Sequence, residues 1–76
     1  MALRFFKGGD VAIRVADESV IVLNPSLEVG YKTYHRDGET IQMIFDELGY
    51  DKSAFKEVSH EEYEEVAEEY RKALPF

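Results

Sequence analysis

The sequence predicts a small α+β domain in which an antiparallel four-stranded meander is followed by two or three helices packed on the sheet. Short apolar, β-branched runs separated by turn residues occupy about residues 2–35, whereas apolar residues at helical spacing occupy about residues 38–74. The links between the runs are too short for parallel crossovers, so we expect antiparallel pairing. A chain of 76 residues without a visible linker predicts one domain, 1–76.

The first two strands are expected at residues 3–6 and 11–16. Between them, Gly8 and Gly9 tolerate the positive φ of a tight hairpin turn. In the second run, bulky apolar residues alternate with alanine and arginine. One face of this strand therefore carries large apolar side chains, and the other carries small apolar side chains and one charge. These two strands are therefore predicted to pair as a hairpin.

The third run, residues 20–23, is apolar on both faces, which is typical of a central strand covered on both sides. If the helices cover only one face of the sheet, an apolar patch stays open, and self-association through the sheet explains it. A helix on each face is the competing explanation, and the sequence leaves both open. In the first case the open face would hold Phe6, Ala12, Ala16 and one of the pairs Ile21/Leu23 or Val20/Val22.

The fourth strand is expected at residues 27–35, with Gly30 marking a β-bulge. A turn at residues 37–38 then leads into a helix whose apolar stripe includes Ile44 and Phe45 and which ends at Gly49 in the left-handed conformation. Residues 51–57 are ambiguous, because Asp51 can cap a short helix while the segment can also be a loop that buries Phe55. We favour a short helix there.

The last helix is expected from residue 59 to residue 74. Ser59 and Glu62 have the spacing of a capping box, in which the serine hydroxyl accepts from the Glu62 amide. One side of this helix is an apolar stripe and the opposite side is acidic. The stripe consists of Tyr63, Val66, Ala67, Tyr70 and Leu74, and the acidic side of Glu61, Glu62, Glu64, Glu65, Glu68 and Glu69.

Five glutamates of that acidic side are predicted to bind a protein partner: Glu61, Glu64, Glu65, Glu68 and Glu69. The distance from the first to the last is about 12 Å along the axis, so the charge density approaches the one charge per ~1.7 Å of duplex DNA. The helix could therefore imitate DNA and occupy the basic groove of a nucleic-acid enzyme. The simpler interpretation is a solvated face on an acidic protein.

Residues 31–36 form the one aromatic and basic stretch of the chain. An anion or an acidic partner could be bound by Lys32, Tyr34, His35 and Arg36. The alternative is an edge strand whose charges discourage aggregation. In an oligomer this patch could instead meet the glutamates of a neighbouring copy.

The composition of the chain limits which partners, cellular locations and functions are expected. A net charge of −7 opposes direct binding to nucleic acid or to anionic lipid, and the absence of cysteine and of a long apolar segment indicates a cytoplasmic location. We expect no metal site, because glutamates fanned over a helix do not converge on one point, and no cofactor. With no recognisable nucleophile or acid/base pair, an enzyme is not expected. The sequence thus predicts a non-enzymatic protein-interaction module, self-associating through its sheet, with a DNA-mimic inhibitor as the alternative.

Overall fold

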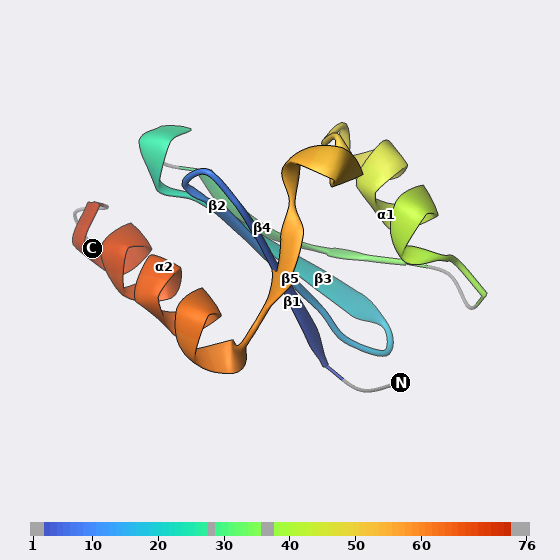
Figure 1. Ribbon diagram of the computed structural model, residues 1–76, viewed down its shortest axis with the longest axis horizontal. Coiled ribbons are helices and arrows are strands. Elements are labelled where there is room, and N and C mark those ends of the chain that lie inside the picture. Colours follow the sequence, from blue (N-terminus) through green and yellow to red (C-terminus); the bar gives the residue numbers. More distant parts are fainter. Residues whose placement is uncertain (1–2, 28, 36–37, 74–76) are drawn as a thin grey trace.

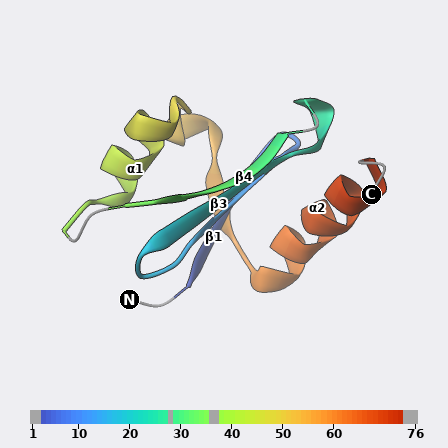
Figure 2. The ribbon, with the colours of Figure 1, turned by 180° about the vertical axis from the view of Figure 1, so that it is seen from behind.

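The computed structural model describes residues 3–27, 29–35 and 38–73. In this part of the chain, a five-stranded antiparallel sheet lies between two helices, one on each face (Figures 1 and 2). The strands are β1 (Arg4–Gly8), β2 (Val11–Val15), β3 (Ser19–Asn24), β4 (Val29–Tyr34) and β5 (Lys56–Val58). The helices are α1 (Ile41–Leu48) and α2 (His60–Ala73), with single 3₁₀ turns η1 (Pro25–Leu27) and η2 (Lys52–Ala54).

The first four strands form the predicted meander, and the α+β class is confirmed. Neighbouring strands pair antiparallel in the order β4-β3-β2-β1-β5. The hairpin between β1 and β2 has Gly9 at φ 58°, a conformation that L-residues with a Cβ adopt at a cost. Glycine at this position therefore permits the tight turn that brings β1 and β2 into register.

The sheet has five strands and not the predicted four. The segment expected to be a short helix, residues 51–57, contains only one 3₁₀ turn, and its last residues belong to β5. Asp51 caps a single 3₁₀ turn by accepting a hydrogen bond from the Ser53 amide at 3.0 Å, and the chain then extends as β5 beside β1. A strand of three residues has no readable periodicity. Its assignment depends on pairing with β1, where Phe5 lies opposite Val58 and Arg4 bonds to Glu57 at 2.8 Å.

Each face of the sheet carries its own apolar core. On the α1 face, Phe45 is fully buried and meets Phe6 and Phe55 edge-on, at centroid distances of 5.3 and 5.1 Å. Such aromatic pairs contribute about 0.5–1.5 kcal/mol beyond their buried area. The α1 core also includes Ile13, Val15, Val20, Val22 and Ile44, and the α2 core consists of Phe5, Ala12, Leu23, Tyr63, Val66 and Ala67.

Of the two explanations left open for the doubly apolar third strand, the structure shows a helix on each face. Val20 and Val22 of β3 pack toward α1, whereas Leu23 packs toward α2. Phe6 does not share a face with Ala12, contrary to the allocation above, because it lies opposite Ile13 and cross-strand partners share a face. The chain reaches both faces because β5 sits at the edge opposite β4, so the link through α1 crosses one face and α2 returns over the other.

The predicted helix ends are largely confirmed. The Glu62 amide donates to the Ser59 hydroxyl at 3.2 Å at the start of α2. Gly49 ends α1 at φ 84°, and its amide donates to the carbonyls of the last turn. At the start of α1, Thr40 accepts a hydrogen bond from the Met43 amide at 3.2 Å. Leu74, assigned above to the α2 stripe, lies outside the described residues.

Gly30 does not form the predicted bulge. The pairing of β3 with β4 runs without interruption from Asn24 opposite Val29 to Ser19 opposite Tyr34. Instead, the hydroxyl and ring of Tyr70 occupy the space that a Cβ on Gly30 would need. Glycine is therefore required here because α2 approaches the strand closely.

Candidate functional site

The acidic side of α2 is exposed, as the spacing of its residues predicts. Glu61, Glu65, Glu68 and Glu69 are exposed, while Glu64 is half-buried. The Glu64 carboxylate lies 3.1 Å from Nε2 of His60, whose ring is 5.1 Å from that of Phe5.

The apolar side of α2 holds these charges in place. Tyr63 is only 6% exposed, and Val66 and Ala67 are buried with it against the sheet. Because the helix is packed on a core, the backbone positions from which its outward glutamates extend are set by the fold.

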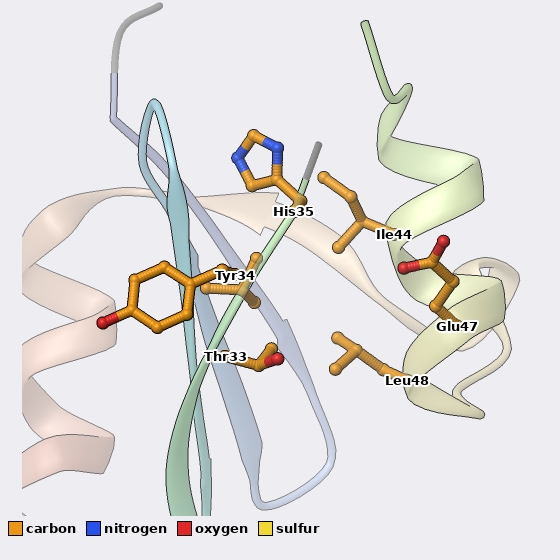
Figure 3. A pocket seen from close by; sticks show the side chains of 7 residues that line it. Thr33, Tyr34, His35, Ile44, Glu47 and Leu48 are labelled. Atoms are coloured by element: carbon orange, nitrogen blue, oxygen red, sulfur yellow. The ribbon is translucent and has the colours of Figure 1, made fainter. Parts of the chain in front are cut away.

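The basic and aromatic stretch of β4 is divided between the two faces of the sheet, because side chains alternate along a strand. Lys32 lies opposite Ile21, on the α2 face, and its Nζ is 5.5 Å from the centre of the Tyr34 ring. Figure 3 shows Tyr34 pointing away from α1. His35 lies against the α1 side, where its Nε2–H donates to the Ala16 carbonyl at 2.8 Å. Arg36 is outside the described residues, so the structure brings together only Lys32 and Tyr34 of the predicted patch.

A hollow of about 160 Å³ lies between His35 and α1, lined also by Thr33, Ile44, Glu47 and Leu48 (Figure 3). Small-molecule sites occupy about 300–1,000 Å³, so this hollow is small for a substrate.

A second hollow, of about 360 Å³, lies between the α2 helix and the sheet. Its sheet side includes Arg14, with Ile21 directly opposite on β3, and Lys32 follows Ile21 on β4. We call this hollow the cationic groove and define it by Arg14, Ile21, Leu23, Tyr63, Glu64 and Arg71. Sequence analysis missed it, because Arg14 and Arg71 are far apart in the chain. The only local signal is an arginine on the lighter face of a strand.

Both arginines line the groove beside Tyr63. Burial raises the pKa of Tyr63, and the positive charges of Arg14 and Arg71 oppose that rise, while Glu64 adds to it. Both guanidinium groups therefore lie within electrostatic reach of the tyrosine hydroxyl. Neither one forms a hydrogen bond or an ion pair with another described residue. The groove thus presents two available cations beside an apolar floor.

A strip of the sheet extends from the groove, with which it shares Arg14 and Ile21, past α2, which packs on β1, β2 and β3. The strip contains Arg14, Ile21 and Lys32 in one cross-strand row and Ser19 and Tyr34 in the next. Tyr34 is 69% exposed. This open strip is the part of the α2 face that remains accessible to a partner.

In the described part of the chain, no group of three or more histidine, aspartate or glutamate side chains is arranged to hold a metal ion. None of the helices found in these residues has the length and apolar character needed to cross a membrane. Comparisons with protein-family models, with curated proteins and with solved structures find no match for this chain.

Proposed function

We propose that this chain is a non-enzymatic protein-interaction module that self-associates through its sheet. The observation that carries the proposal is the open strip, where apolar and aromatic side chains lie among cations on a molecule with a net charge of −7. Such a surface attracts an acidic, partly apolar partner, and the chain itself supplies one in α2. With no cysteine to oxidise, a cytoplasmic location is part of the proposal.

The surface available for self-association is smaller than the sequence suggested, since a helix lies on each face. Self-association can use the open strip on the α2 side or the outer edge of β4. The open strip offers Ile21 and Tyr34, and β4 is an edge strand whose outer backbone groups can pair with another strand. Lys32 on β4 is the kind of charged residue that discourages uncontrolled edge pairing, so we favour the open strip.

Sedimentation equilibrium tests the proposal directly. We expect the purified protein to pass from monomer to dimer as its concentration rises through the micromolar range. A strict monomer at high micromolar concentration would contradict self-association through any part of the sheet.

A second candidate function follows from the exposed glutamates. Their fixed spacing on α2 favours a DNA-mimic inhibitor that binds a nucleic-acid enzyme in its basic groove. Partners captured from the native host should then lose affinity when Glu61, Glu65 and Glu68 are changed together to glutamine, and binding should weaken steeply with salt. Binding that is insensitive to both changes would exclude mimicry.

A further inference from the structure

The side of α2 that borders the cationic groove carries opposite charges at matched positions. Glu64 and Arg71 both line the groove and are seven residues apart. Seven residues are close to two helical turns, so the two side chains emerge from the same side of the helix, about 10.5 Å apart along its axis. This side of α2 therefore has one negative and one positive site along its length.

Two copies of such a surface are complementary in charge when their helices run antiparallel. If a two-fold axis passes between Ala67 and Glu68, Glu64 of one copy faces Arg71 of the other, and Arg71 faces Glu64. In a parallel arrangement, each glutamate would face a glutamate and each arginine an arginine. Opposite charges therefore favour the antiparallel arrangement over the parallel one.

We propose that two copies of this chain dimerise by packing their α2 helices antiparallel, each at the cationic groove of the other. The proposal rests on the proposed self-association and names its surface. Ion pairs join Glu64 and Arg71 across the two-fold axis.

The unassociated molecule leaves the required groups available. Arg14 and Arg71 have no ion pair to another described residue, so dimerisation displaces none from them. Glu64 gives up only a contact with His60, whose side chain is 64% exposed and therefore well screened by water. Closing the groove also covers the half-buried Ile21, which adds apolar area to the interface.

Charge-reversal variants test this arrangement. Glu64→Arg and Arg71→Glu should each raise the dimer dissociation constant at least about tenfold, since each places like charges opposite one another at two symmetric sites. The double variant, Glu64→Arg with Arg71→Glu, should return the constant to within about threefold of the wild type, because the pairs reform with their signs exchanged. This restoration is specific to the two-fold, antiparallel contact.

Matched controls change charge by the same amount elsewhere on α2. Glu62→Arg and Lys72→Glu change exposed residues that do not line the groove, and they should leave the dissociation constant within about threefold of the wild type. Far-ultraviolet circular dichroism and thermal unfolding of each variant establish that it folds. The double variant keeps the test valid if a single variant is unstable.

The possible results distinguish self-association, the α2 contact and its antiparallel pairing. A wild-type monomer at high micromolar concentration would overturn this proposal together with the proposed self-association. A dimer whose dissociation constant is unchanged by the single reversals would overturn the α2 contact alone and point to the β4 edge. Single variants that dissociate without restoration in the double variant would overturn the antiparallel pairing and indicate that the groove holds a different acidic surface.

Discussion

Replacing Gly30 with alanine tests whether β4 needs a glycine because of Tyr70. A Cβ at this position would overlap the hydroxyl, Cζ and Cε1 of the Tyr70 ring. Tyr70 packs against the core on the α2 face, so its ring cannot move away without losing contacts there. The substitution therefore couples a strand at one edge of the sheet to the far end of α2.

The expected magnitude is the difference between two effects. Alanine in a strand interior is favoured over glycine by about 0.5–1 kcal/mol. Overpacking a filled site costs about 1–3 kcal/mol. Gly30→Ala should therefore lower the free energy of unfolding by up to about 2.5 kcal/mol in the wild type, yet raise it by about 0.5–1 kcal/mol when Tyr70 is also alanine. The coupling energy between the two positions should be about 1–3 kcal/mol.

Urea unfolding of the wild type, both single variants and the double variant measures this coupling. All four proteins are compared at one low concentration, because self-association adds to apparent stability. With a slope of about 1 kcal/mol per molar urea for a domain of this size, a loss of 1 kcal/mol lowers the midpoint by about 1 M. Tyr70→Phe is the matched control, since it removes the hydroxyl but keeps the ring atoms that overlap, so most of the coupling should remain.

A coupling energy below about 0.5 kcal/mol would refute the close-contact explanation, because positions that do not interact have additive effects. The approach of Tyr70 would then not explain the glycine at position 30.

Three other changes have definite expectations. Thr40→Ala removes the hydroxyl that accepts from the Met43 amide and should lower stability by about 0.5–2 kcal/mol in thermal or urea unfolding; an unchanged midpoint would show that the cap is unimportant. Gly49→Ala places a Cβ at φ 84° and should cost about 1–2 kcal/mol by the same measurement, and a neutral effect would contradict the left-handed conformation. In the wild type, the hydrogen bond from Arg4 lowers the pKa of Glu57 in the folded state. Glu57→Gln weakens this bond. Its stabilisation is therefore present above the ordinary value of 4.5 and lost as the pH falls through the folded value. The difference in stability between wild type and Glu57→Gln should shrink on acidification to about pH 3, and a difference independent of pH would argue against the pair.

The local features of the fold were predictable because each depends on neighbours in sequence. The spacing of Ser59 and Glu62 identified the start of α2, and Gly49 identified the end of α1. The alternation of β2 correctly assigned Ile13 and Val15 to one face and Ala12 to the other, and the apolar stripe of α2 correctly separated buried from exposed side chains. A side chain's direction along a regular strand or helix follows from its period alone.

The structure places the described residues of the predicted basic patch on both faces of the sheet, which follows from the alternation of side chains along a strand. Lys32 and Tyr34 are two residues apart and share a face, whereas His35 is an odd number of residues from Lys32 and points to the other side. The two-residue period of a strand therefore predicts that Lys32 and Tyr34 lie on one face of the sheet and His35 on the other.

From the sequence alone follow the four-strand meander, the helices at about residues 41–48 and 60–73 and the outward acidic side of α2, since all of these arise from local periodicity and capping. The third, short helix favoured at residues 51–57 does not. The tertiary structure decided that the helices lie on opposite faces of the sheet, that residues 56–58 form a fifth strand, and that Arg14 and Arg71 line one groove beside Tyr63. These features depend on which distant segments pair. A short segment such as β5 acquires its conformation from its partner strand, and two cations converge only after the sheet and helix have packed.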